Sequence, residues 1–373
     1  MGNPRCKICG TVTQKWGKTS AGKPRFRCPV CRASHTRRND TKARDMAAFL
    51  DFVTGTIHYI DLPGHGRNAR RRFAPLWKIW PLMDPVDEVH HVVFVDGIYL
   101  SHKLVVLIAC TRSYVLGWHV ARSENAAAWQ ALFDRIAAPD VVVCDGGSGI
   151  AKAVRRSWPT TSIQRCIFHA FSVVKRHTTI RPRTQAGVDL YGLAKDLLKV
   201  DSREKSLTWL SDLTAWNAQY KDFLAEKTKL ANGAYVDTHQ RLIKAKNSLN
   251  TLARQGTLFT FLEPDLVVDD DPIPAMSNLI EGKINSQLRA MVRHHRGMGL
   301  DHQIKAVCWW CYLHTENPKS PARLLENAVT DEHIQALFAS AANRGQAQHE
   351  INRWGTGVNW ADFHHAVPWK ENY

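Results

Sequence analysis

The chain has 373 residues, of which 44% are hydrophobic, and this composition excludes wholesale disorder. No segment approaches the roughly 18–20 consecutive apolar residues of a membrane span, and the first ten residues lack the apolar stretch of an export signal. We therefore expect a cytoplasmic protein whose nine cysteines stay reduced, so paired cysteines indicate metal binding. The net charge is +16, and residues 1–78 hold 17 Lys and Arg against 4 Asp and Glu, which indicates a polyanionic, phosphate-bearing partner.

Two Cys-x-x-Cys pairs lie near the N-terminus. Cys6 and Cys9 form the first pair, Cys28 and Cys31 form the second, and 18 residues separate the inner cysteines. This spacing is typical of a tetrahedral site in which four thiolates bind Zn²⁺. About 35 residues bury too little apolar surface to fold alone, so the metal is needed for folding. His35 is an alternative ligand, although contact with phosphate or solvent is the simpler role for it.

Basic residues surround these cysteines and continue beyond them. Arg side chains make bidentate contacts with phosphate and guanine, so this region predicts a DNA-binding surface. Residues 44–60 have helical spacing, residues 61–64 interrupt it, and a basic segment follows at residues 67–80. This pattern resembles a helix-turn-helix, although two helices that merely pack together would also fit it. The candidate DNA contacts here are Arg25, Arg27, Arg32, Arg37, Arg38, Arg70, Arg71 and Arg72.

From residue 90 the pattern changes to buried strands. A run of β-branched and aromatic residues ends in Asp96-Gly97, and a later run, residues 141–144, ends in Asp145-Gly146. The expected order is β-β-β-α-β-α-β, with strands at 90–96, 103–110, 114–122, 141–144 and 162–167, and helices at 123–138 and 149–158. In the RNase H-like fold the first and fourth strands are neighbours, so the two aspartates would converge on Mg²⁺. Either Asp-Gly taken alone is more simply a turn.

A third carboxylate is expected on a later helix. Residues 183–262 are typical of an all-α insertion, an acidic loop follows, and Glu281 then begins a helix. The spacing of Asn278 and Glu281 also fits a capping box, in which Glu281 would be structural. Its neighbours at helical steps, Asn285, Arg289 and Arg293, suit contact with DNA, opposite a buried stripe formed by Ile280, Ile284, Leu288 and Met291. The rival third ligand is the run Asp269–Asp271, which lies in a loop and would be held less rigidly.

These residues resemble a known family. Asp96-Gly97, Cys144-Asp145-Gly146, Cys166-x-x-His169 and Asn278-x-x-Glu281-x-x-x-Asn285 resemble the Mutator-like superfamily of DDE transposases, in its bacterial insertion-sequence branch with an N-terminal zinc ribbon. The resemblance covers about residues 5–315. It implies catalysis by Asp96, Asp145 and Glu281 with Mg²⁺ or Mn²⁺, a helical insertion, and a dimer or larger assembly on paired element ends. Ser277 stands where related chains often have Thr, which does not affect the acids.

Cys166 and His169 belong with the catalytic residues by this resemblance. Their expected role is structural or hydrogen-bonding beside the acids, because two ligands make no complete metal site; metal binding is the alternative. Cys308 and Cys311 form another Cys-x-x-Cys pair, but their Trp-rich surroundings indicate a core helix.

The sequence therefore predicts an α/β protein with an RNase H-like mixed-sheet core interrupted by an all-α insertion. The expected function is an insertion-sequence transposase that acts on double-stranded DNA, at the element's terminal inverted repeats and at target DNA, in the bacterial nucleoid. The alternatives are an RNase H-type nuclease and a catalytically idle DNA-binding regulator. The expected units are a zinc ribbon (1–38), a helical DNA-binding segment (39–86), the first part of the core (87–182), the insertion (183–262), the acidic loop with the catalytic helix (263–320) and a helical tail (321–373).

Overall fold

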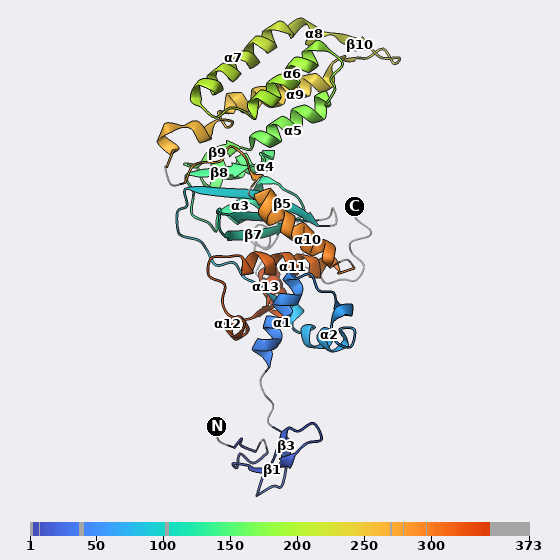
Figure 1. Cartoon of the computed structure of the whole chain (residues 1–373), viewed down its shortest axis with the longest axis vertical. Helices are drawn as coiled ribbons and strands as arrows, with labels where there is room; N and C mark the ends of the chain where they lie inside the picture. The colour runs from blue at the N-terminus through green and yellow to red at the C-terminus, as the bar shows by residue number, and fades with distance from the viewer. Residues whose placement is uncertain are drawn as a thin grey trace.

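The structure is a computed structural model that describes residues 3–6, 8–36, 41–100, 104–268, 271–278, 280–295 and 297–343. Figure 1 shows the small N-terminal strands at one end of the molecule and a block of helices at the other, with a sheet between them. None of the helices in these ranges is long and apolar enough to cross a membrane.

A five-stranded mixed sheet forms the centre of the fold. Its strand order is β7-β6-β5-β8-β9. Strand β6 runs antiparallel to both β7 and β5, whereas β5, β8 and β9 run parallel to one another. Every residue of β6, β7 and β8 is buried, as their runs of β-branched residues predict. All five predicted strands are present, although β5 ends later and β9 ends earlier than predicted; the bounds are β5 Val92–Leu100, β6 Leu104–Cys110, β7 Val115–Ala121, β8 Val141–Cys144 and β9 Ser162–Arg165.

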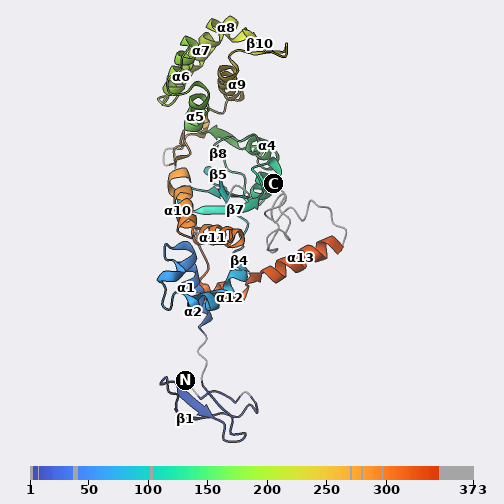
Figure 2. The same cartoon turned by 90° about the vertical axis from the view of Figure 1, so that its right-hand side faces the viewer.

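Each face of the sheet has its own apolar core, because successive side chains of a strand point to opposite faces. On one face, Val93 and Val95 pack with Trp129 and Trp158 of the segments around α3 (Ala126–Phe133) and α4 (Ser148–Ser157). On the other face, Phe94 lies in one core with residues of α10 (Ser286–His294) and α11 (Leu300–Leu313). Figure 2 shows α10 and α4 on opposite sides of the sheet.

The helix α11 carries the second Cys-x-x-Cys pair into this core. Cys308 and Cys311 are 1% and 0% exposed, which confirms the interpretation of this segment as a core helix. Burial raises the pKa of the Cys308 thiol to about 12, so this thiol is held neutral.

The helical block after the sheet differs from the predicted insertion in two ways. Its first helix, α5, begins at Ile167 where the end of a strand was expected, and it packs on α6 and α9 in a separate apolar core. The block is also not all-α, because a short antiparallel hairpin lies within it. Its elements are α5 Ile167–Thr178, α6 Gln185–Leu197, α7 Arg203–Gln219, α8 Lys221–Ala225, β10 Lys227–Lys229, β11 Tyr235–Asp237 and α9 Gln240–Gln255. Two 3₁₀ turns follow, η3 Thr260–Leu262 and η4 Pro264–Leu266.

At the N-terminal end, three short strands form an antiparallel sheet: β1 Gln14–Lys18, β2 Pro24–Arg27 and β3 Ser34–Thr36. We call residues 3–36 the head. The next elements are α1 Lys42–Thr54, η1 Tyr59–Asp61, α2 Arg67–Phe73, η2 Leu76–Lys78 and β4 Ile79–Trp80.

The basic helix α2 is shorter than expected. It ends at Phe73, and residues 76–80 form a 3₁₀ turn and a short strand where helix was predicted. The preceding helix α1 is built into the main core, since Phe49 packs edge-on against Trp309 of α11. Both helices contribute buried side chains to this core.

The C-terminal segment returns to the same region. It consists of α12 Pro321–Glu326, β12 Val329–Thr330, which pairs with β4, and α13 Asp331–Asn343. The rest of the expected helical tail lies outside the described residues. Lys305 of α11 is only 2% exposed, and its Nζ donates to the carbonyl of Trp77 and to Asp331, each at 2.7 Å. This buried contact ties the C-terminal segment to α11.

Candidate functional site

The parallel pair β5 and β8 brings the first two candidate acids together. Val95 of β5 is paired with Cys144 of β8, so Asp96 and Asp145 follow at corresponding positions of neighbouring strands. Asp145 comes directly after β8, as expected, whereas β5 continues four residues past Asp96 instead of ending there. The longer strand is possible because residues 97–100 keep their pairing with β6.

Backbone amides fix both carboxylates. The Asp96 carboxylate accepts a hydrogen bond from the Gly97 amide at 2.8 Å, and the Asp145 carboxylate accepts one from the Gly147 amide at 3.1 Å. Burial, together with the negative charges of Asp145 and Glu281, raises the pKa of Asp96 to about 6 despite the Gly97 amide. Clustered negative charge of this kind favours a bound proton or a cation.

The third candidate acid, Glu281, lies on a π-helical turn, η5 (Ile280–Asn285), that leads into α10. The predicted capping partner was Asn278, but it is Ser277 that donates its hydroxyl to Glu281 Oε1, at 2.7 Å. The predicted buried stripe is confirmed, because Ile280, Ile284, Leu288 and Met291 are each at most 6% exposed. Asp271 of the rival acidic run is paired with Arg112 at 2.7 Å, while Asp269 and Asp270 lie outside the described residues.

Cys166 and His169 lie beside Glu281. Cys166 is the residue before α5, His169 is in the first turn of α5, and His169 Nδ1 is 3.4 Å from Glu281 Oε1. Burial alone would raise the pKa of the Cys166 thiol, but hydrogen bonds with His169 and Ser277 outweigh it and lower the pKa. The same contact with Cys166 is the main reason that the pKa of His169 is raised.

Asn285 was predicted to contact DNA, and its position corrects that expectation. It is 0% exposed, and its Nδ2 donates to Asp96 Oδ2 at 2.6 Å. Within the described residues, its Oδ1 is buried without a hydrogen-bond partner. Asn285 therefore orients Asp96 from the helix that carries Glu281, whereas Arg289 and Arg293 of α10 are exposed.

A fourth carboxylate, that of Glu124, lies near Asp96 and Asp145, and the sequence analysis did not identify it. Glu124 immediately precedes Asn125, whose side chain caps α3, so the sequence around it indicates only the opening of a helix. A Cβ added at Gly97 would lie 2.4 Å from Glu124 Oε1, so the glycine makes room for this acid. Burial and the charges of Asp145 and Asp96 raise the pKa of Glu124 to about 7. The only signal for Glu124 in the sequence is the position of an acidic residue directly before the helix that follows the third strand.

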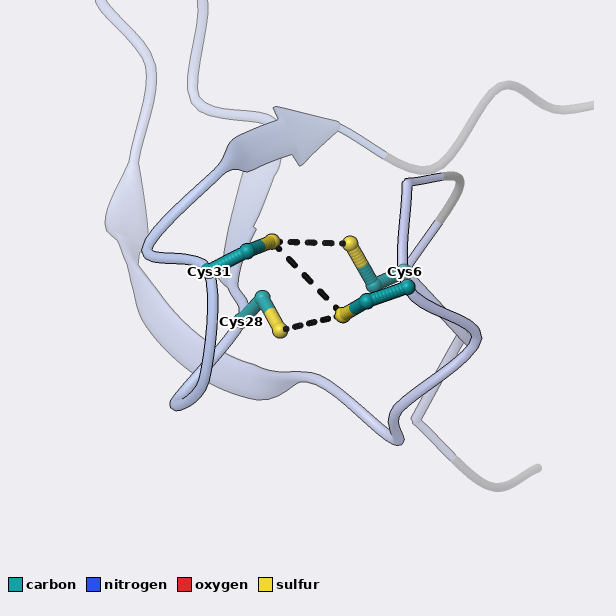
Figure 3. Close-up of side chains that lie close together, drawn as sticks. Cys6, Cys28 and Cys31 are labelled. Carbon is teal, nitrogen blue, oxygen red and sulfur yellow. Dashed lines mark hydrogen bonds between the residues drawn. The ribbon is translucent and has the colours of Figure 1, made fainter.

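The four N-terminal cysteines converge in the head. The Sγ atoms of Cys6 and Cys31 are 3.4 Å apart, as are those of Cys9 and Cys28, and those of Cys9 and Cys31 are 3.7 Å apart (Figure 3). All four thiols are free, and the four Sγ atoms lie within 4.8 Å of one another. A tetrahedron with Zn–S bonds of about 2.3 Å has edges of about 3.8 Å, close to these separations.

The candidate DNA contacts of the N-terminal region differ in their surroundings. Arg25 and Arg32 are exposed on the head, and Arg27 stacks 4.6 Å over the Trp16 ring. Arg72 is instead held in an ion pair with Asp45 at 2.5 Å. Arg70 and Arg71 are exposed on α2, and Arg37 and Arg38 lie outside the described residues.

The chain thus combines a mixed β-sheet, which presents two aspartates on adjacent parallel strands, with a head that contains four cysteines. The sequence profile of the family described as "Transposase, Mutator family" matches residues 85–255, which contain both aspartates. Residues 85–255 of the chain are therefore similar to the transposases of the Mutator family.

Two curated relatives agree with this family. The first is the transposase for insertion sequence element IS905 of Lactococcus lactis subsp. lactis (strain IL1403), 24% identical over 149 residues that cover 35% of this chain and 37% of the relative. The second is a probable transposase for an insertion sequence element of Corynebacterium diphtheriae, 28% identical over 116 residues that cover 26% of this chain and 34% of the relative. Each match spans about a third of the relative's own length.

Proposed function

We propose that this chain is a DNA transposase that binds the ends of its element and performs metal-dependent strand cleavage and strand transfer with Asp96, Asp145 and Glu281. The observation that carries the proposal is the register of β5 and β8, which sets two aspartates at corresponding positions of neighbouring strands. Glu281 lies near enough to Asp96 for its negative charge to contribute to the raised pKa of Asp96.

The donor set fits divalent cations with oxygen ligands. Asp96, Asp145 and Glu281 supply carboxylates, and the orphaned Oδ1 of Asn285 is a further buried oxygen beside Asp96. Mg²⁺ and Mn²⁺ prefer such ligands. Bound there, the cations would activate the attacking oxygen and stabilise the leaving oxygen of an in-line displacement.

The protein's own groups hold this site in place. The amides of Gly97 and Gly147 and the side chain of Asn285 orient the two aspartates. The hydroxyl of Ser277 does the same for Glu281, and His169 lies beside that carboxylate. The exposed Arg289 and Arg293 continue along α10 from Glu281, where they would contact DNA phosphates. Displacement by water or by a DNA 3′-hydroxyl needs no covalent protein intermediate.

The remaining parts of the proposal follow from the strand order and from the head. Three antiparallel strands followed by two parallel ones, with α3 and α4 between the later strands, support an RNase H-like core. The four converging thiols of the head support a bound Zn²⁺, and its exposed arginines support binding to the element ends. Transposition needs two ends in one complex, so we expect a dimer or larger assembly on DNA.

The test is to incubate the purified chain with Mg²⁺ and DNA that carries the element's own ends, and to map the cut strands. The proposal predicts cleavage at the ends followed by joining to a target strand. Cleavage without joining would instead indicate a nuclease of RNase H type, and binding without cleavage would indicate an idle DNA-binding regulator. Either result contradicts the proposal.

A further inference from the structure

A second group of metal-ligating side chains shares Glu281 with the proposed catalytic acids. Cys166, His169 and Glu281 place a sulfur, a ring nitrogen and a carboxylate oxygen within 4.8 Å of one another. Cys166 and His169 come from the start of α5, and Glu281 comes from the π-helical turn η5, more than 100 residues later. The fold therefore brings together three ligand types that the sequence keeps apart.

Ser277 orients two of the three side chains. It is 2% exposed, its amide donates to Cys166 Sγ at 3.3 Å, and its hydroxyl donates to Glu281 Oε1 at 2.7 Å. Outer hydrogen bonds of this kind fix the direction of metal ligands and tune their affinity. These hydrogen bonds hold the two side chains in fixed positions, as expected for metal ligands and not for side chains that are close by chance.

His169 has a nitrogen available for this site. Within the described residues, its Nδ1 is shielded from solvent and has no hydrogen-bond partner, although it lies 3.4 Å from Glu281 Oε1. Two ligands bound to one tetrahedral Zn²⁺ at about 2.0–2.1 Å are about 3.3–3.4 Å apart. A shared cation would satisfy both atoms at close to their present separation.

We propose that Cys166, His169 and Glu281 form a three-ligand site for a borderline-soft divalent cation such as Zn²⁺, with its fourth position open. Thiolate and imidazole ligands select Zn²⁺ and its neighbours in the transition series, whereas Mg²⁺ requires oxygen. Binding of the cation releases the Cys166 thiol proton to solvent. Glu281 then coordinates this cation and is not available to the catalytic one. The inference rests on the proposed function in one respect, that Glu281 is also the third catalytic acid; occupation would then oppose Mg²⁺-supported cleavage.

The test uses Co²⁺ as the probe and the full chain with zinc retained in its head. Co²⁺ bound by a thiolate absorbs strongly in the near ultraviolet, so a titration should show one further equivalent per chain with this band. Cys166→Ser should abolish the band, and His169→Asn or Glu281→Gln should weaken Co²⁺ binding at least about tenfold. The control is Cys308→Ser, which removes a buried thiol from α11 and should leave the band unchanged.

Two outcomes would overturn the site: no thiolate band at millimolar Co²⁺, or a band that survives Cys166→Ser. Circular dichroism of each variant establishes that it is folded. Asp96→Asn separates this inference from the proposed function, because it should lose DNA cleavage and keep the Co²⁺ band. DNA cleavage without the Co²⁺ band would contradict only the site formed by Cys166, His169 and Glu281. The Co²⁺ band without DNA cleavage would contradict only the proposed function.

Discussion

Every residue of β6 and β7 in the sheet is buried, whereas in the head the buried residues among those described are Cys6, Thr13, Phe26 and Cys28. The sheet is covered by apolar side chains on both faces, so burial of apolar surface accounts for its stability. The described part of the head has no comparable apolar core, but its four thiols converge. We therefore expect the two regions to differ in what they need for folding, with the head dependent on a bound metal ion and the sheet independent of it.

The largest effect is expected when the head loses a thiolate. Cys28→Ser removes one of four ligands, so we expect loss of bound zinc, unfolding of the head and loss of specific binding to element ends, while the sheet keeps its melting temperature. Elemental analysis, calorimetry and binding assays measure these three quantities. Val30→Ser, an exposed neighbour in the same turn, serves as the control. Zinc and end binding that survive Cys28→Ser would refute the distinction.

The reverse change should affect only the core. Trp129 is 0% exposed between the sheet and its covering helices, so Trp129→Ala leaves a cavity and should cost about 3–5 kcal/mol of unfolding free energy. Denaturant unfolding measures the loss, and the zinc content should stay at its wild-type value. A variant that lost zinc together with core stability would show that the two regions fold as one unit.

Acid should also weaken the core selectively. Burial, with a contribution from Arg135, lowers the pKa of His119 on β7 to about 4, so in the folded protein His119 stays neutral down to that pH. The unfolded chain binds a proton below about 6.5. The free energy of unfolding should therefore fall between pH 6.5 and pH 4, by on the order of 3 kcal/mol from this group.

The matched variant for this effect is His119→Phe, which cannot titrate. Melting temperatures measured across the same pH range should fall less steeply for His119→Phe than for the wild-type chain. Equal slopes for the two proteins would remove His119 as the cause.

The smallest effect concerns charge on the head. Arg25 is exposed there, so Arg25→Ala should weaken DNA binding uniformly across sequences and reduce the slope of log K against log salt by about one. Arg323→Ala, an exposed arginine on α12, is the control and should leave the slope unchanged. Salt-independent binding by the wild-type chain would contradict the role of the head.

Much of the sheet could be predicted because buried strands carry continuous β-branched runs, and Asp96 and Asp145 stand out directly against those runs. Asn285 and Glu124 could not be placed in the same way. Asn285 shares a helix face with arginines, and only the packing of α10 on the sheet turns it toward Asp96. Glu124 looked like part of a helix opening, and its approach depends on the space above Gly97. The positions of both side chains depend on contacts between segments that lie far apart in the sequence.

The start of α5 was missed for a related reason. The predicted strand at 162–167 includes Cys166 and Ile167, whereas Ile167, Ala170, Phe171 and Val174 recur at helical spacing and belong to α5. Ile167 taken alone fits the end of a strand or the start of a helix, and the packing of α5 on α6 and α9 selects the helix.

Strand cleavage by amide variants of Asp96, Asp145 and Glu281 shows whether these three acids act as one metal site. Asp96→Asn, Asp145→Asn and Glu281→Gln each remove a charge while nearly preserving shape. Each should reduce cleavage of element-end DNA by orders of magnitude, with end binding near wild type and with penalties far from additive in the double variants. Asp140→Asn, at the opposite end of β8, should cleave normally. Near-wild-type cleavage by Glu281→Gln would contradict the account, because a residue with only a capping role tolerates glutamine.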